Sequence, residues 1–298
     1  MASPAPLPPE RAARINRAAG AAAVSTATLL VALKLWAFVD TGALSIAASL
    51  ADSALDLLAS MAGLVAVIYA ARPPDEDHAF GHTSAEDLAA LGQAAMVSIS
   101  ALAIGAGAVS RLSMDEGAPP LESEGVGIAV MAVSMALTGA LILLQGWAAK
   151  RTGSKVIAAD RLHYLGDLLP NAGALAALAV SARWGIGHVD AVVALAAAIG
   201  LLLGAGKIGA GAWHALMDRA ADPDVVARIA EICDGIEGLA GWHDLKTRTS
   251  GARLFIQIHV EIDGRLTLDE AHERGERLRR AVEGALPNAE VLVHKDPV

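Results

Sequence analysis

Two pairs of ionisable side chains stand inside apolar stretches of the sequence. Asp52 and Asp56 lie in SLADSALDLLASMAG, and His163 and Asp167 lie in ADRLHYLGDLLPNAG. A spacing of four residues puts both members of a pair on one face of a helix, one above the other. If the two helices face each other, the four side chains offer three carboxylate oxygens and one imidazole nitrogen. That ligand set suits a tetrahedral cation such as Zn²⁺.

The free-energy cost of these acids also favours a bound cation. Each acid near the middle of a bilayer costs about 2.5–3.5 kcal/mol. Lys34, in the first apolar stretch, is the only candidate for a basic partner at matching depth. A divalent cation would compensate the acids directly, and Cd²⁺, Fe²⁺, Mn²⁺ and Co²⁺ fit the same ligands because affinity order alone does not select the ion. The alternative is that two polar helix faces line a water-filled cavity without a metal.

A second set of ligands lies in RPPDEDHAFGHTSAEDL, between two apolar stretches. Asp75, His78 and His82 fall within eight residues, and the two histidines are four apart. This spacing indicates a metal site in a loop at the membrane surface, and the alternative is an ordinary acidic, solvated loop. Ser84 resembles the N-cap of the helix that follows, with Asp87 three residues on.

Four of the nine histidines lie near the C-terminus, at His243, His259, His272 and His294. Asp296 follows His294 by two residues, so both side chains point to the same face of a strand. A shared imidazole–carboxylate cluster there would suit zinc. Taken singly, a histidine is more often an ordinary surface or core residue.

The composition indicates a membrane protein with a soluble domain attached. Hydrophobic residues make up 54% of the 298 residues, the mean hydropathy is +0.47 and 18% of residues are charged, whereas soluble domains carry about 25% charge. The last 80 residues hold 26 of the charged ones. We therefore expect an N-terminal cytoplasmic tail at 1–13, a transmembrane domain at 14–218 and a cytoplasmic metal-binding domain at 219–298.

Six stretches are long and apolar enough to span a bilayer, which needs roughly 20 residues per helix. They are rich in Ala, Leu, Val and Gly, and the small residues let helix backbones approach closely in lipid. We therefore predict an all-α bundle of six membrane helices. The predicted helices are 14–38, 44–71, 85–111, 124–149, 156–182 and 189–217.

The distribution of basic residues predicts the orientation of the bundle. Lys and Arg flank one set of helix ends, and the loops at the other ends are short or acidic, as in MDEGAPPLESE. The positive-inside rule then places both termini in the cytoplasm, together with the loop that carries His78. The basic residues on the cytoplasmic side are Arg11, Arg14, Arg17, Arg72, Lys150, Arg151 and Lys155.

The sequence after residue 218 predicts a small two-layer α+β domain in the order α-β-β-α-β. LFIQIHVEI alternates with the period of two that is typical of a strand, and TSGA fits a hairpin turn. The predicted elements are a helix at 222–235, strands at 243–249 and 252–262, a helix at 267–284 and a strand at 289–295.

Several function classes are excluded or disfavoured. The net charge of −9 and the lack of a basic stripe argue against a nucleic-acid partner. A single cysteine, Cys233, rules out a disulfide framework or a thiolate cluster within one chain. An enzyme has little support, because the sequence shows no nucleotide loop or activated nucleophile, and four protein ligands leave a metal no open position for chemistry.

Several long segments together resemble the cation diffusion facilitator family over nearly the whole chain. They are SLADSALDLLAS, HAFGHTSAEDLAAL, ADRLHYLGDLLPNAG, LMDRA, HDLKTRTSG, FIQIHVEI and VLVHKDP. The resemblance implies a six-helix membrane domain and a cytoplasmic domain like a metallochaperone, assembled as a homodimer in the bilayer. Glu76 and Arg248 match the family's charge pair between the two domains, with Glu in place of the commoner Asp.

The resemblance also implies three sets of metal ligands. The implied transport ligands are Asp52, Asp56, His163 and Asp167. The implied loop site is Asp75, His78 and His82. The implied cytoplasmic site is binuclear and uses His243, His259, His272, His294 and Asp296, with Asp296 as the bridge.

These observations lead us to expect a secondary transporter of the plasma (inner) membrane that exports a divalent transition metal, Zn²⁺ before the others, by alternating access. Protons are the expected counter-ions, because the ligands must be deprotonated to bind metal and His163 is a natural proton carrier, since the unperturbed pKa of histidine is about 6.5. One alternative is a membrane-bound metal sensor, but a sensor needs no ligands at mid-bilayer. The other is a passive channel, but a closed four-ligand site binds too tightly for fast conduction.

Overall fold

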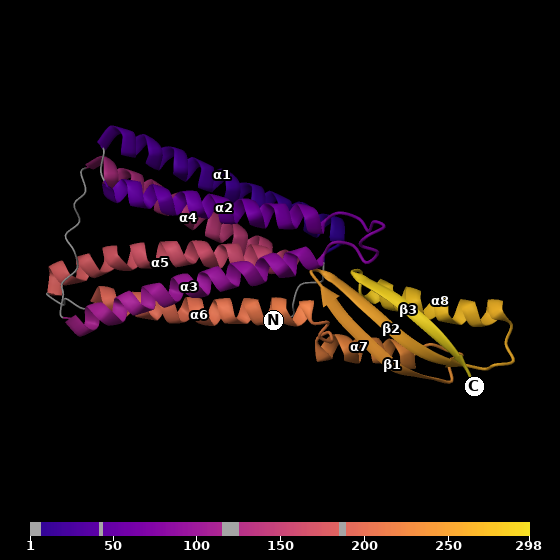
Figure 1. The fold of residues 1–298 in the computed structure, drawn as a ribbon. Helices are drawn as coiled ribbons and strands as arrows, with labels where there is room; N and C mark the ends of the chain where they lie inside the picture. The colour runs from indigo at the N-terminus through magenta and orange to yellow at the C-terminus, as the bar shows by residue number, and fades with distance from the viewer. Residues whose placement is uncertain (1–6, 42–43, 115–124, 185–188) are drawn as a thin grey trace.

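The computed structural model describes residues 7–41, 44–114, 125–184 and 189–298. Six long helices lie side by side, and a small α/β domain extends from one end of them (Figure 1). The acidic segment 115–124, predicted to be a loop, lies outside the described residues.

The six long helices begin and end within a few residues of their predicted bounds. Helix α1 begins earlier than the predicted start at 14, because proline favours the first turn of a helix and Glu10 there suits the helix dipole. Part of the segment predicted to be an N-terminal tail is therefore helical. The helices are α1 Pro9–Thr41, α2 Leu44–Ala70, α3 Ser84–Met114, α4 Gly125–Thr152, α5 Lys155–Trp184 and α6 Val189–Leu216.

Five helices within the described part of the chain are long and apolar enough to cross a membrane: α1, α2, α3, α4 and α6. They confirm a helical transmembrane region. Helix α5 is outside this set, and its first half carries Lys155, Asp160, Arg161, His163 and Asp167. Two of the candidate ligands, His163 and Asp167, thus lie on a helix whose first half is rich in charged residues.

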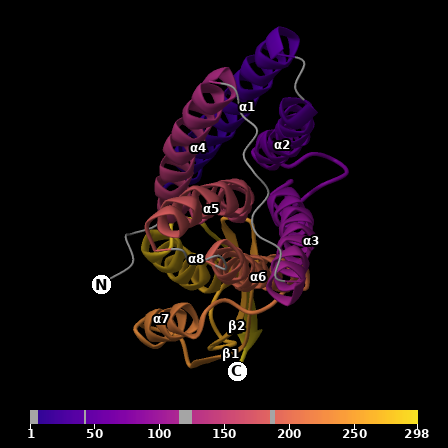
Figure 2. The ribbon, with the colours of Figure 1, turned by 90° about the vertical axis from the view of Figure 1, so that its left-hand side faces the viewer.

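Small residues let the helices pack closely. Helix α3 packs along α6, and α1 packs along α2 and α4, while α5 contacts α3, α4 and α6 (Figure 2). A Cβ atom added to Gly204 of α6 would lie only 3.0 Å from Leu162 of α5, and one added to Gly63 of α2 would lie 3.1 Å from Gln93 of α3. This close packing holds α5 inside the bundle, where its polar side chains reach α2 and α4.

The C-terminal domain has the predicted order α-β-β-α-β. Its three strands form one sheet in the order β1-β2-β3, with β1 antiparallel and β3 parallel to β2. Helix α8 begins with a capping box, in which Thr267 and Glu270 satisfy each other's backbone N–H groups. The elements are α7 Pro223–Asp234, β1 Gly241–Ser250, β2 Arg253–Ile262, α8 Leu268–Ala285 and β3 Ala289–Pro297.

Alternation along β2 separates the core of this domain from its polar face. Ile256, Ile258 and Val260 are buried and pack in one hydrophobic cluster with Ile229 of α7 and Leu278 of α8. Successive side chains of a strand point to opposite faces. The residues between these three, including the histidine of this strand, therefore point away from the two helices.

Leu278→Ala should lower the free energy of unfolding of the C-terminal domain by about 2–5 kcal/mol, because the substitution leaves a cavity where the side chain is 0% exposed. Leu268→Ala is the matched control on the same helix, since Leu268 is 83% exposed. It should change the stability by less than about 0.5 kcal/mol. Hydrogen exchange of the β2 amides in the intact protein measures both, and unchanged protection in Leu278→Ala would contradict the assigned core.

Candidate metal sites

The first cluster of ligands joins helices α2 and α5. One ligand atom from each of Asp56, His163 and Asp167 lies within 4.8 Å of the other two. His163 Nε2 is 3.0 Å from Asp56 Oδ1 and 4.0 Å from Asp167 Oδ2. The side chains of Asp56 and His163 are largely buried, at 15% and 17% exposure. We call these three residues the intramembrane cluster.

Asp52 lies outside the intramembrane cluster. It is one helical turn earlier on α2 and is exposed. Lys34, the basic residue expected near the acids, donates from Nζ to Ser53 Oγ at 2.7 Å and to the Ser49 carbonyl oxygen at 3.1 Å. The structure therefore brings together three of the four predicted ligands.

A buried hydrogen-bond network lies next to the intramembrane cluster. Ser60 Oγ is 2.8 Å from the Tyr164 hydroxyl and donates to Asp160 Oδ1 at 3.4 Å. Gln145 Nε2 of α4 donates to Asp160 Oδ2 at 2.5 Å. Ser60 follows Asp56 by one helical turn, so the network fixes α2 and α4 against α5 where the ligands converge. Sequence reasoning missed this network, because serine and glutamine have no ligand spacing to reveal them.

The second cluster forms within the loop between α2 and α3. Asp75 Oδ1 is 3.1 Å from His78 Nδ1, and Asp75 Oδ2 is 3.2 Å from His82 Nε2. The His78 backbone N–H also donates to Asp75 Oδ1 at 2.8 Å. His82 is buried against the ring of Tyr69, with the ring centroids 4.6 Å apart. All three predicted loop ligands come together, and we call them the loop cluster.

The charge of Asp75 suits a cation site. Desolvation raises the pKa of the Asp75 carboxyl. The hydrogen bonds from the backbone and the side chain of His78 together lower it by more, so the pKa lies below its ordinary value. The carboxylate is therefore ionised at neutral pH. Each of its oxygens faces a different imidazole.

The third cluster follows from the register of the C-terminal sheet. His243 of β1 pairs with His259 of β2, and His259 pairs with His294 of β3. Asp296 Oδ2 is 2.9 Å from His259 Nδ1 and 3.4 Å from His243 Nε2. Asp296 Oδ1 is 3.3 Å from His294 Nε2. Because both carboxylate oxygens face imidazoles, Asp296 is placed as a bridging ligand would be. We call His243, His259, His294 and Asp296 the C-terminal cluster.

Two residues differ from the predicted composition of this cluster. Glu261 was not predicted, yet its Oε1 lies 3.2 Å from His243 Nδ1. It follows His259 by two residues, as Asp296 follows His294, so the same-face rule for strands would have identified it. His272 was predicted as a ligand, but it is exposed on α8 and lies outside the metal-ligand groups found in the described residues.

Arg248 pairs with a different acid from the one expected. Its Nη1 lies 3.1 Å from Asp218 Oδ1, and its guanidinium packs over the rings of Phe80 and Phe255 at 5.1 and 4.5 Å. Glu76, the predicted partner, is exposed in the loop and forms no ion pair with Arg248 in the described part of the chain. Asp218 has a positive φ of 53° just after α6, and this turn brings the acid to β1.

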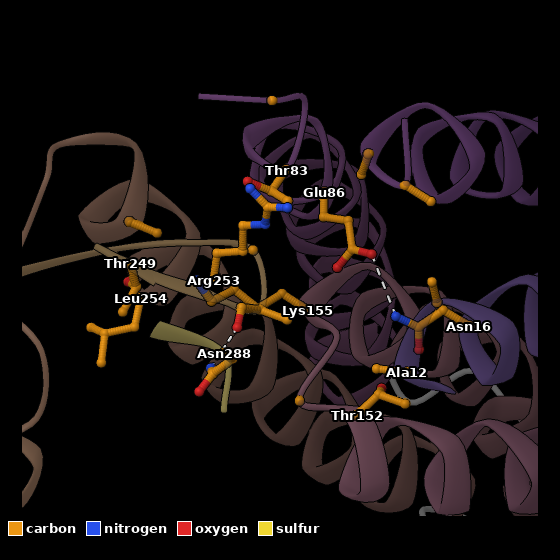
Figure 3. Close-up of a pocket in the computed structure, with 18 of the residues that line it drawn as sticks. Ala12, Asn16, Thr83, Glu86, Thr152, Lys155, Thr249, Arg253, Leu254 and Asn288 are labelled. Carbon is orange, nitrogen blue, oxygen red and sulfur yellow. Dashed lines mark hydrogen bonds between the residues drawn. The ribbon is translucent and has the colours of Figure 1, made fainter. Parts of the chain in front are cut away.

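A cavity of about 960 Å³ lies between the helix bundle and the C-terminal domain. Figure 3 shows Asn16, Glu86 and Lys155 on its helix side and Arg253 on its sheet side. His82 of the loop cluster also lines it. The cavity therefore gives ions from solution a space that borders both domains and the loop cluster.

All three clusters offer the same chemistry, carboxylate oxygens and imidazole nitrogens, which suits divalent first-row cations. Thiolate is absent from them. Cys233, the one cysteine of the chain, is buried in the core of the C-terminal domain, and burial raises the pKa of its thiol to about 11. This ligand chemistry disfavours Cu(I), which prefers soft sulfur ligands.

Two family models together match most of the chain. The model of the cation efflux transmembrane domain matches residues 21–217, and that of the cation efflux protein cytoplasmic domain matches residues 221–298. The second match covers the domain that holds the C-terminal cluster. The first covers the helices that hold the other two clusters.

Curated relatives match over nearly the same length. The cation-efflux pump FieF of Serratia proteamaculans is 39% identical over 285 residues, which are 96% of this chain and 94% of the relative. FieF of Yersinia enterocolitica has the same identity and coverage. Among solved structures, the metal-bound C-terminal domain of the CzcD transporter from Thermotoga maritima is 24% identical and covers 25% of this chain and 87% of its own, with a TM-score of 0.24. The chain therefore belongs to the cation diffusion facilitator family, whose members are integral membrane cation-efflux transporters.

Proposed function

We propose that the protein carries a divalent transition-metal cation, Zn²⁺ before the others, out of the cytoplasm through Asp52, Asp56, His163 and Asp167. The observation that carries the proposal is the intramembrane cluster, in which three ligand atoms from two helices of the bundle lie within 4.8 Å of one another. Acids at this depth are costly unless they are compensated, and a bound cation compensates them. Cation-efflux relatives along the whole chain support the outward direction.

In this proposal α5 is the sixth membrane span. Its 30 residues are long enough to cross a bilayer, and its packing against α3, α4 and α6 shields its polar half from lipid. The six spans make up a membrane domain at 14–218, with the domain at 219–298 in the cytoplasm. Both termini then lie on the cytoplasmic side of the plasma (inner) membrane.

The position of Asp52 supports alternating access. Asp52 shares a face of α2 with Asp56 but lies outside the cluster in this arrangement, and a shift or rotation of α2 relative to α5 would bring it to the ion. We assign the present arrangement to a state in which three of the ligands lie together. In a second state all four ligands would lie together. The ion would bind and leave as these two states interconvert.

Proton exchange follows from the chemistry of the same ligands. The Nε2 atom of His163, which faces both Asp56 and Asp167, is the atom that would bind the metal. A metal and a proton compete for it, because a ligand must be deprotonated to bind. Protons arriving from outside would therefore release the ion, and the proton gradient would drive export.

The other two clusters lie outside the bilayer in this topology. We assign to the loop cluster a single cation at the cytoplasmic surface. We assign to the C-terminal cluster a binuclear zinc site in which Asp296 bridges, since both of its oxygens face imidazoles. The family resemblance supports a homodimer that is joined at least in part through these cytoplasmic domains.

A metal sensor that binds without transporting is the rival function. The C-terminal cluster alone would suffice as its receptor. A sensor has no need of acids inside the helix bundle, and these cost free energy in every state without metal. The intramembrane cluster therefore favours transport.

A His163→Ala/Asp167→Ala double variant should lose zinc transport by about 100-fold or more, because both changes remove ligands from the intramembrane cluster. Asp40→Asn is the control, since Asp40 is an exposed acid at the end of α1. It should transport at close to the wild-type rate. Flux into proteoliposomes that contain a zinc-sensitive dye, with and without a pH gradient, measures both. Normal flux in the double variant, or wild-type flux that ignores the gradient, would contradict the proposal.

Single cysteines should report the proposed topology. Cys233 is buried and the pKa of its thiol is raised, so the wild-type protein should react little with a membrane-impermeant maleimide. Glu10→Cys and Val298→Cys should react only from the cytoplasmic side. Ser113→Cys, at the far end of α3, should react only from outside. Labelling of Glu10→Cys and Ser113→Cys from the same side would overturn the orientation.

Zinc binding to the C-terminal cluster should weaken steadily as the pH falls, because protons compete with the metal for ligands that must be deprotonated to bind it. The hydrogen bond from His259 lowers the pKa of Asp296. A carboxyl with a lowered pKa loses its charge only below its usual range, so Asp296 keeps its charge until the pH falls below that range. Calorimetry in buffers of different ionisation enthalpy measures the affinity and the protons released. His259→Ala is the control and should release fewer protons, whereas an affinity that does not vary with pH would refute the assignment.

A further inference from the structure

The first turn of α3 is bound directly to the hairpin of the C-terminal domain. The backbone N–H of Gly251, in the turn between β1 and β2, donates to Asp87 Oδ2 at 2.7 Å. Ser250 Oγ lies 2.7 Å from Thr83 Oγ1 and 2.9 Å from Ser84 Oγ. Asp87 and Ser250 are 1% and 5% exposed. Three polar contacts in a buried place therefore join the two domains.

The other oxygen of the Asp87 carboxylate contacts the first residue of α5. Lys155 Nζ lies 2.7 Å from Asp87 Oδ1. Lys155 is the first residue of α5, two turns before His163 of the intramembrane cluster. A buried carboxylate without its cation is strongly destabilising, so the ion pair is expected to persist. One side chain thus binds the C-terminal domain with one oxygen and the ligand-bearing helix with the other.

The hairpin fits this position closely. Gly251 has a positive φ of 53°, and a Cβ atom there would lie 2.9 Å from the carbonyl oxygen of Thr83. A residue with a side chain would force the hairpin away from α3. The close approach therefore requires glycine, and it keeps the N–H of this residue aimed at Asp87.

A neighbouring acid ties the same turn to the rest of the bundle. Glu86 accepts from Ser154 Oγ at 3.2 Å and from Asn16 Nδ2 of α1 at 3.4 Å. Figure 3 shows Asn16, Thr83, Glu86 and Lys155 around the cavity between the domains. The first turn of α3 is thus anchored to α1 and to the start of α5, so the hairpin contact cannot loosen without affecting them.

We propose that Asp87 is a positioning residue that couples the C-terminal domain to helix α5, so that a change in either is transmitted to the other. The transport part of this inference rests on the proposed function, since it assumes that α5 carries the transport ligands. Coupling between two sites is reciprocal, so a change on α5 must also be felt in the hairpin. That consequence can be measured without any transport.

The test is hydrogen exchange in the intact protein with the ion pair broken from the α5 side. In Lys155→Met the carboxylate of Asp87 loses its cation and is expected to take up a proton or turn toward the cavity. The Gly251 N–H then loses its acceptor, and exchange of the hairpin amides 249–254 should rise about tenfold or more, which corresponds to about 1.4 kcal/mol. Lys150→Met is the matched control, because it removes the same charge from the exposed end of α4. It should leave the hairpin unchanged.

A transport measurement on the same variants separates coupling from simple support. Lys155→Met and Asp87→Asn should lower the maximal zinc flux about fivefold or more with little change in the zinc concentration at half-maximal flux, because the ligands themselves are untouched. Lys155→Arg retains the cation and should restore both flux and hairpin protection. If wild-type protein moves no cation, the proposed function fails while the exchange test still decides the coupling. Unchanged hairpin exchange in Lys155→Met, or a rise of equal size in Lys150→Met, would overturn it.

Discussion

The structure depends most on the need to compensate acids inside an apolar bundle. In lipid the hydrophobic effect does not hold helices together, so small residues and polar contacts must do so. Asp160 is 3% exposed and accepts from Gln145 of α4 and Ser60 of α2. His163 lies between Asp56 and Asp167. The acids of α2 and α5 therefore serve two purposes, since the contacts that make them tolerable also hold these helices in the geometry of the proposed cation site.

The three clusters use the same ligands on supports of different rigidity. The C-terminal cluster stands on three hydrogen-bonded strands, and its geometry is set by their register. The loop cluster stands on a short connection whose shape depends on local hydrogen bonds to Asp75. The intramembrane cluster stands on two separate helices, so its geometry changes whenever they move relative to each other. A site that must bind and release an ion is well placed on movable helices, whereas a site that keeps an ion is better placed on a sheet.

The features that the sequence could predict are those set by short-range patterns. Apolar length and small-residue content predicted the six long helices, and the period of two in LFIQIHVEI predicted β2. The close spacing of Asp75, His78 and His82 within eight residues predicted every member of the loop cluster that the structure assembles. The features that the sequence could not predict are contacts between distant segments. The position of Asp52 outside its cluster, the Arg248–Asp218 ion pair and the contacts of Asp87 depend on how helices and domains dock, which no local pattern encodes.

The β1–β2 hairpin connects the C-terminal cluster to these docking contacts. His243 lies near one end of β1, and Ser250 ends the strand beside α3. Ser250 follows His243 by seven residues, with a register shift between His243 and Lys246, and from Lys246 to Ser250 the strand is paired with β2 at every residue. In Figure 1 the β1–β2 hairpin extends from the C-terminal domain toward the helices. The hairpin therefore joins the C-terminal cluster to the α3 turn, and Asp87 is where the hairpin meets the ion pair with Lys155. The metal ligands of the two domains are thus linked by a strand, one carboxylate and two turns of helix.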